Sequence, residues 1–118
     1  MQQAKAIAVL QIGYYPAMLQ IRQSLLEHEG YAVTSVLGND QGMAVATSAN
    51  FDVIVVGFST DTEIRITMVR WLKQNVPRSP VVALLAHSLE SLPDVDCETL
   101  SENPSVWLTA VRQTCAKP

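Results

Sequence analysis

The sequence has 118 residues, which suits a single domain over residues 1–118. Apolar residues make up 48% of it and charged residues 16%, so the chain can fill a core and lacks the composition of a disordered protein. The formal net charge is −3, and the eight basic residues form no run. This balance argues against a surface for nucleic acid or for an anionic membrane.

The start of the chain and its two cysteines favour a cytoplasmic protein. The first apolar run, Ala6–Leu10, is too short for the core of a signal peptide, and no apolar run reaches membrane-spanning length. Cys97 and Cys115 fit a reducing compartment as free thiols. We therefore expect a cytoplasmic location and no membrane partner.

The first third of the chain predicts a strand, a helix and a second strand. Ala6–Leu10 is uniformly apolar and β-prone, which is typical of a strand buried on both faces. Pro16 suits the first turn of a helix and Gly30 its end, and Tyr31–Leu37 is rich in β-branched residues. The expected core stripe of the helix has helical spacing: Met18, Ile21 and Leu25.

The middle of the chain predicts a turn at 38–40, a short helix over Gln41–Ala49 and a strand over Asp52–Val56. A capping box follows, with Thr60 as the cap of the next helix and Glu63 reaching back to it. That helix should continue until the prolines that end it, with apolar residues on one side: Ile64, Met68, Trp71 and Leu72.

The last third predicts two strands and a final helix. Val81–Leu85 is a fourth buried strand, and Ser88–Leu92 has room for little more than one helical turn. Val95–Leu100 is a strand interrupted by polar residues. Asn103 should cap the last helix, with Pro104 at its first position. The core stripe of that helix is Leu108, Val111 and Cys115.

Buried strands that alternate with helices predict a parallel sheet covered on both faces. Five strand–helix units in this length suit the flavodoxin-like, doubly wound α/β fold, (βα)5, with a shortened fourth helix. Ligands in this fold bind beyond the carboxyl ends of the strands. The residues that follow each strand should therefore decide what the domain can do.

Four segments carry a more specific pattern: VLQIGYYP at 9–16, LLEHEGYAV at 25–33, FDVIVV at 51–56 and PVVALLAH at 80–87. Together they resemble the receiver domains of bacterial response regulators, the CheY-like family. The resemblance implies an acidic pair after the first strand, a phosphoryl-accepting aspartate at the end of the third, a hydroxyl after the fourth and a lysine after the fifth. In that family the carboxylates hold Mg²⁺, and the metal and the lysine offset the charge of the phosphoryl group.

The resemblance places these positions on residues of other chemistry: Gly13 and Tyr14 for the acids, Gly57 for the acceptor, Leu85 for the hydroxyl, and Asn103 or Glu102 for the lysine. Glycine cannot be phosphorylated, and a site without carboxylates cannot hold Mg²⁺ tightly. We expect the aromatic ring of Tyr14 to fill the pocket. The sequence thus predicts a vestigial phosphorylation site in a domain that is no enzyme and binds no metal or cofactor.

Three hypotheses for function remain. The first is a pseudo-receiver in bacterial signal transduction that contacts a protein partner or a second copy of itself, with Val106 and Trp107 on the last helix as the interface. The second is a small-anion or metabolite sensor that uses Ser59 and Thr60 in the emptied pocket, although a plain capping turn explains these two residues as well. The third is an unrelated enzyme on the same fold, for which we find no nucleophile–base pair.

Overall fold

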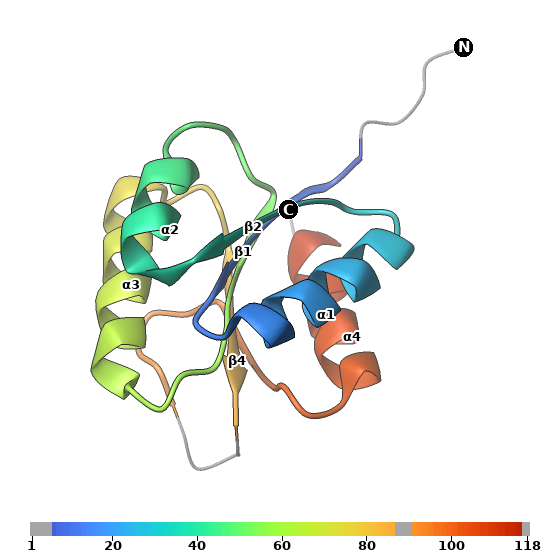
Figure 1. Cartoon of the computed structure of the whole chain (residues 1–118). Helices are drawn as coiled ribbons and strands as arrows, with labels where there is room; N and C mark the ends of the chain where they lie inside the picture. The colour runs from blue at the N-terminus through green and yellow to red at the C-terminus, as the bar shows by residue number, and fades with distance from the viewer. Residues whose placement is uncertain (1–5, 87–90, 117–118) are drawn as a thin grey trace.

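The computed structural model describes residues 6–86 and 91–116, and a parallel sheet of five strands runs through them (Figure 1). The strands are β1 (Ala8–Gly13), β2 (Ala32–Leu37), β3 (Val53–Val56), β4 (Val81–Leu85) and β5 (Cys97–Leu100). Their order in the sheet is β2-β1-β3-β4-β5, and all neighbours are parallel. This is the flavodoxin-like, doubly wound arrangement, so the predicted fold class is confirmed.

Two pairs of helices cover the two faces of the sheet (Figure 1). On one face lie α1 (Pro16–His28) and α4 (Pro104–Ala116), and on the other lie α2 (Gly38–Ala46) and α3 (Thr62–Asn75). Every residue of β3 and β4 is buried, which explains why these two strands are uniformly apolar.

The segment between β4 and β5 differs from the predicted short helix. Residues 87–90, on which most of that prediction falls, lie outside the described residues, and residues 86 and 91–96 are not helical. Leu92 is 2% exposed and packs into the core under α3. Its N–H and the hydroxyl of Ser91 both donate to Oε1 of Glu98, at 2.9 and 3.0 Å. The described part of this connection is thus anchored by hydrogen bonds and contains a turn at residues 93–94.

Two element boundaries in the first half differ from the prediction. β1 runs on beyond the apolar run Ala6–Leu10 to Gly13, because it pairs with β2 as far as Leu37. The predicted turn at 38–40 is the first turn of α2. Gly38 takes a φ of 83°, which glycine adopts freely, and the side chain of Gln41 accepts from the N–H of Leu37 at 2.9 Å.

The caps of the two later helices are only partly as predicted. Asp61 caps α3, since its Oδ1 accepts from the N–H of Ile64 at 3.3 Å. Thr60, the predicted cap, lies one residue outside, and its N–H donates to the hydroxyl of Tyr15. Asn103 caps α4 as expected, because its Oδ1 accepts from the N–H of the second helical residue at 3.0 Å.

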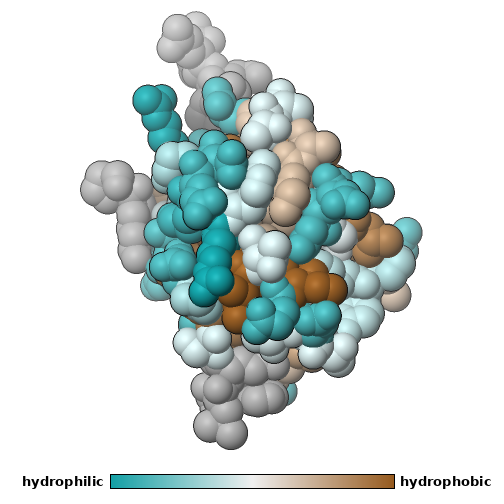
Figure 2. Space-filling model, turned by 90° about the vertical axis from the view of Figure 1, so that its left-hand side faces the viewer, coloured by the Kyte–Doolittle hydropathy of each residue, from teal (hydrophilic) through white to brown (hydrophobic). Residues whose placement is uncertain are grey.

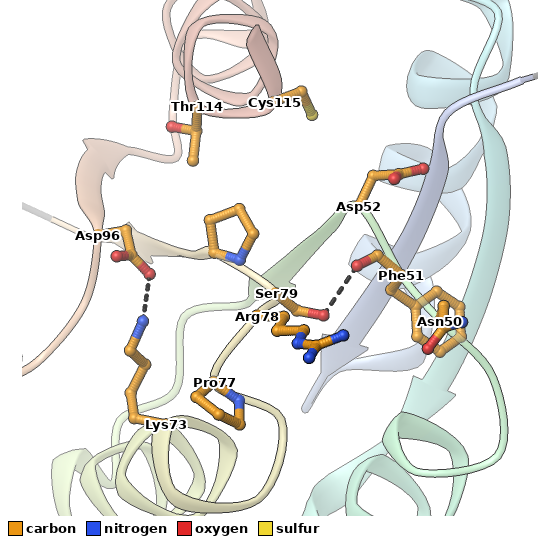
Figure 3. Close-up of a pocket in the computed structure, with 11 residues that line it drawn as sticks. Asn50, Phe51, Asp52, Lys73, Pro77, Arg78, Ser79, Asp96, Thr114 and Cys115 are labelled. Carbon is orange, nitrogen blue, oxygen red and sulfur yellow. Dashed lines mark hydrogen bonds and ion pairs between the residues drawn. The ribbon is translucent and has the colours of Figure 1, made fainter. Parts of the chain in front are cut away.

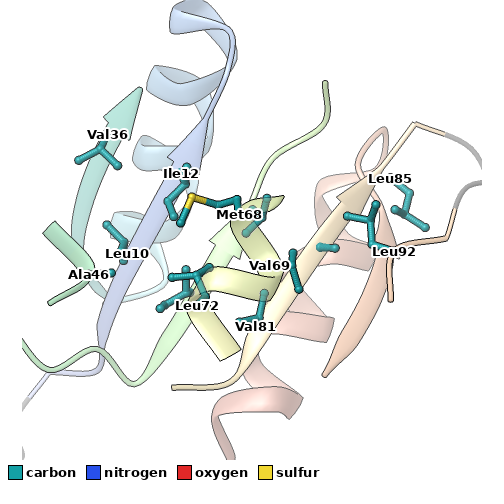
Figure 4. Packing of buried hydrophobic residues seen from close by; sticks show 13 residues of the cluster. Leu10, Ile12, Val36, Ala46, Met68, Val69, Leu72, Val81, Leu85 and Leu92 are labelled. Carbon is teal, nitrogen blue, oxygen red and sulfur yellow. The ribbon is translucent and has the colours of Figure 1, made fainter. Parts of the chain in front are cut away.

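The core has one layer on each face of the sheet. The layer under α2 and α3 is drawn in Figure 4 and includes Leu10, Ile12, Met68 and Leu72. The layer under α1 and α4 includes Trp107, which is 1% exposed and packs with Val9, Leu26, Val55 and Val111. The prediction of Trp107 as an interface residue is therefore wrong, because its ring fills the space between α4 and the sheet.

The inner side of α1 is not the predicted apolar stripe. Met18 and Ile21 are 39% and 54% exposed, whereas the helix buries Arg22 and Leu26 against the sheet. An arginine can take this place because its long stem is apolar and only the guanidinium needs a polar surrounding.

On α3, too, a residue predicted for the core is exposed and an arginine is buried. Ile64 is 39% exposed, and its neighbour Arg65 is completely buried. Nη1 of Arg65 donates to the carbonyl of Leu84 at 3.2 Å, near the end of β4. Each face of the sheet thus contributes one buried arginine.

Candidate functional site

Two glycines lie side by side at the carboxyl ends of the central strands. Gly13 ends β1, and Gly57 follows β3 directly; both are buried. The N–H of Gly57 donates to the carbonyl of Ile12 at 2.8 Å, which holds the two chain segments together. Between β1 and β3 the order of the sheet reverses, and this crevice is where doubly wound folds bind ligands.

The space beside both glycines is taken by side chains of α1. A β-carbon on Gly13 would lie 2.5 Å from Cδ1 of Leu19, and one on Gly57 would lie 3.0 Å from Nη1 of Arg22. The next atoms around that point at Gly57 are the carbonyl oxygen of Ile12, at 3.3 Å, and Cα of Gly13. A guanidinium therefore lies where we expected the ring of Tyr14.

Tyr14 closes the side of the crevice toward α2. Its hydroxyl donates to Oδ1 of Asn39 at 2.7 Å, and Nδ2 of Asn39 donates to the carbonyl of Ile64 at 2.9 Å. Burial raises the pKa of Tyr14 to about 12, so the phenol stays protonated at neutral pH. These bonds join the end of β1 to the first turns of α2 and α3, beside a hollow of about 440 Å³ lined in part by Leu37.

A second aromatic residue bridges the loops after β1 and β3. The hydroxyl of Tyr15 accepts from the N–H of Thr60 at 3.2 Å, and hydrogen bonding from Thr60 lowers the pKa of Tyr15. The rings of Tyr15 and Phe58 stack with centroids 6.3 Å apart. The guanidinium of Arg65 lies 5.5 Å from the centroid of Phe58 on a cation–π contact. The crevice is thus covered by an aromatic pair and a cation.

The turn at Ser59 and Thr60 uses its donors locally. Ser59 is 7% exposed, and its hydroxyl accepts from the N–H of Asp61 at 3.1 Å. The N–H of Thr60 bonds to Tyr15, and the N–H of Ile64 bonds to the carboxylate of Asp61. A carboxylate at this helix N-terminus competes with any incoming anion for the same dipole. The contacts support the capping-turn interpretation of these residues.

A larger hollow, of about 610 Å³, lies at the opposite end of the sheet, where the strands begin (Figure 3). Oδ2 of Asp52 accepts from the N–H of Ala8 at 2.7 Å, and Oδ2 of Asp96 accepts from the N–H of Val81, also at 2.7 Å. Nζ of Lys73 contacts the same oxygen of Asp96 at 2.8 Å. Burial, with a smaller effect of Asp52, raises the pKa of Cys115, so this thiol stays protonated.

No protein-family model matches the sequence, and no curated protein matches it either. Solved structures do match. The chemotaxis protein CheY4 of Vibrio cholerae has a TM-score of 0.79 at 18% identity, covering 93% of this chain and 99% of that one. The signal receiver domain of an HD domain-containing protein from Pseudomonas fluorescens has a TM-score of 0.81 at 16% identity, covering 93% and 94%.

This chain has the receiver fold. The response regulator TrrA of Thermotoga maritima, crystallised with Mg²⁺ and BeF, gives a TM-score of 0.80 at 12% identity and covers 92% of this chain and 98% of that one. TrrA has also been crystallised in complex with the histidine kinase ThkA. At these identities the likeness concerns the fold, and the chemistry must be argued from the residues of this chain.

The receiver fold brings some of the predicted positions together and separates others. Gly13 and Gly57 are adjacent, and Tyr14 lies at their edge. Leu85, at the end of β4, is 4% exposed and belongs to the α2–α3 core. Asn103 is exposed and caps α4. Among the described residues no three His, Cys, Asp or Glu side chains are grouped so as to hold a metal ion.

Sequence reasoning missed the two buried arginines. A signal was present, because Arg22 stands four residues before the buried Leu26, and Arg65 stands three before Met68 and seven before Leu72. These are spacings of one helix face. A hydropathy pattern treats arginine as a surface residue, so it does not predict that these two side chains are buried.

Within the described residues, no helix has the length and apolar character to cross a membrane.

Proposed function

We propose that this chain is a pseudo-receiver of bacterial signal transduction that acts through contact with a protein partner and accepts no phosphoryl group. The observation that carries the proposal is the end of β3, where Gly57 has no side chain and the guanidinium of Arg22 lies against it. Phosphoryl transfer to a receiver needs a carboxylate nucleophile at this position. We therefore propose a domain without enzymatic activity and without a cofactor.

The charges around the crevice support this proposal. Mg²⁺ prefers oxygen ligands, above all carboxylates, and Gly13, Tyr14 and Gly57 provide none from their side chains. Asp61, four residues after Gly57, accepts the capping hydrogen bond of α3. Two buried guanidiniums lie at the same edge of the sheet, so a divalent cation would meet positive charge there.

The face formed by α1 and α4 is the contact surface that we propose. Val106 on α4 is 48% exposed, and α1, which lies on the same side of the sheet as α4 (Figure 1), carries the exposed residues Met18 and Ile21. Figure 2 shows the opposite face, over α2 and α3, as mainly hydrophilic with a small hydrophobic area. Ile21 and Val106 are the two most exposed of the large apolar side chains of the described residues, and such exposure favours association with a protein partner or with a second copy.

The first experiment tests phosphoryl transfer. The protein is incubated with acetyl phosphate and Mg²⁺, and its intact mass is measured by mass spectrometry. We expect an unchanged mass. A stoichiometric phosphoryl adduct that mild base removes would contradict the proposal.

The second experiment tests the contact surface. Val106→Asp places a charge on the α1–α4 face, and Ile64→Asp places the same charge at a comparably exposed apolar position on α3. We expect sedimentation velocity and partner pull-down to show that Val106→Asp weakens association while Ile64→Asp leaves it intact. Equal behaviour of both variants and the wild type would exclude Val106 from the interface.

A further inference from the structure

Arg22 is a buried cation, and no carboxylate of the described residues forms an ion pair with it. Its side chain is 5% exposed, and its Nε makes no hydrogen bond within the described part of the chain. Burial lowers the pKa of Arg22. A guanidinium keeps its charge in proteins, and a buried charge without a partner is strongly unfavourable. The burial of the Arg22 side chain therefore needs a structural explanation.

The position of the guanidinium explains why residue 57 is glycine. The backbone of Gly57 does not have a positive φ, unlike that of Gly30 and Gly38, so its conformation would admit any residue. A β-carbon at position 57 would lie 3.0 Å from Nη1 of Arg22, a tight contact that the flexible end of the arginine could relieve only by moving a few tenths of an ångström. The first atoms of a side chain at position 57 and the guanidinium would thus compete for one volume.

We propose that Arg22 takes the place of the acceptor side chain, so that residues 22 and 57 act as a pair. Its guanidinium fills the volume beside Gly57 and puts a fixed positive charge at the end of β3. At contact distances such a charge repels a divalent cation. Restoring acids to the crevice would then restore only weak metal binding, as long as Arg22 is present. This inference stands apart from protein contact, since either can fail without the other.

A double-mutant cycle tests the pairing directly. Gly57→Asp sets a carboxylate next to Nη1 of Arg22, and Arg22→Met removes the charge while keeping an apolar stem. We expect Gly57→Asp to be tolerated beside Arg22, because the two charges compensate each other. In the double variant the carboxylate is buried alone, and the unfolding equilibrium constant should exceed the product of the single effects at least tenfold.

The control cycle replaces Arg22→Met by Arg78→Met. Arg78 is exposed and lies at the far end of the sheet, beside the hollow where the strands begin. Its effect should multiply with that of Gly57→Asp within about twofold, as expected for distant sites. Urea unfolding followed by tryptophan fluorescence measures all variants. Effects of Arg22→Met and Gly57→Asp that multiply like those of the control pair would overturn the proposal.

A metal titration provides a second test. The acid-restored chain carries Gly13→Asp, Tyr14→Asp and Gly57→Asp, once with Arg22 and once with Arg22→Met. We expect MgCl₂ at constant ionic strength to give a saturable rise in melting temperature at a concentration at least tenfold lower in the variant without Arg22. Equal midpoints would overturn the proposal. Should the acid-restored chain with Arg22 fail to fold, the double-mutant cycle decides.

Discussion

The two ends of the sheet differ in the charged side chains that lie against the strand backbone. At the end where the strands begin, Asp52 and Asp96 each accept a backbone N–H, from Ala8 and Val81. At the end where the strands finish, Arg65 donates to the carbonyl of Leu84, and the guanidinium of Arg22 lies close to the crevice between β1 and β3.

The backbone explains this distribution. Parallel strands leave N–H groups unpaired where they begin and C=O groups unpaired where they end. Carboxylates complement the first edge, and guanidiniums complement the second. A receiver that uses Mg²⁺ must keep carboxylates at the carbonyl edge, where only the metal makes them favourable. Asp52, Asp96 and Arg65 are placed as the backbone favours, which is what a structural role predicts.

We expect the largest loss of stability from a substitution at the amino edge, which is the end of the sheet where the strands begin. Asp96→Ala leaves the N–H of Val81 without its carboxylate and also removes the contact with Lys73, so we expect a loss of about 2 kcal/mol in the free energy of unfolding. Lys73→Met is the matched control, because it removes only the partly exposed ion pair and should cost about 0.5 kcal/mol. Urea denaturation measures both variants. Equal losses would mean that the ion pair, and not the strand N–H, matters.

At the carboxyl edge, which is the end of the sheet where the strands finish, Tyr14 should make the stability of the protein depend on pH. The pKa of Tyr14 is about 12 in the folded protein against 10.0 for an unperturbed tyrosine, so the folded state holds the phenolic proton more tightly. This stabilisation is complete below pH 10 and is lost as the pH rises from 10 toward 12. By pH 11 the wild type should lose about 1.4 kcal/mol that Tyr14→Phe does not lose. Parallel unfolding curves of the two proteins between pH 8 and 11 would contradict the assignment.

Much of this architecture was predictable, because the strands in the centre of the sheet are uniformly apolar. The runs at 53–56 and 81–85 are buried on both faces, which requires helices on each side and therefore the doubly wound order. Gly57 could be placed at the carboxyl edge because it closes such a run, whereas Gly13 was placed there by the resemblance to receivers. Their adjacency follows from the strand order, which the resemblance also implies.

The contents of the crevice could not be predicted in the same way. Whether Arg22 points inward depends on its guanidinium finding room beside Gly57, which is a tertiary effect and leaves no mark in a hydropathy pattern. The position of Trp107, which was predicted at an interface and lies in the core, also depends on tertiary packing. A large ring on a helix is compatible with the core or with an interface, and only the packing under α4 decides for the core.

A smaller loss is expected at the first strand. Asp52→Ala removes the acceptor of the N–H of Ala8, which opens β1. Both residues lie near the surface, so water can replace the carboxylate, and we expect a loss of about 1 kcal/mol. Glu102→Ala, an exposed acid in the loop before α4, serves as the control and should leave stability unchanged. If hydrogen exchange at Ala8 is not accelerated by Asp52→Ala, the carboxylate is not what holds the start of β1.

The smallest expected effect is that of Mg²⁺ on the wild type, and it tests the difference between the two ends of the sheet most directly. We expect millimolar MgCl₂ to leave the melting temperature of the wild type where an equal ionic strength of NaCl leaves it. The carboxylates at 52 and 96 lie at the amino edge and are engaged with backbone N–H groups, and at the carboxyl edge the carboxylate of Asp61 is engaged in capping α3 beside two buried guanidiniums. Screening by either salt should act equally on these charges. A saturable rise with Mg²⁺ alone would reveal a cation site in the wild-type chain. The same titration in Asp96→Ala would then locate it, since loss of the rise would assign the ion to the amino edge and persistence of the rise would point to the crevice.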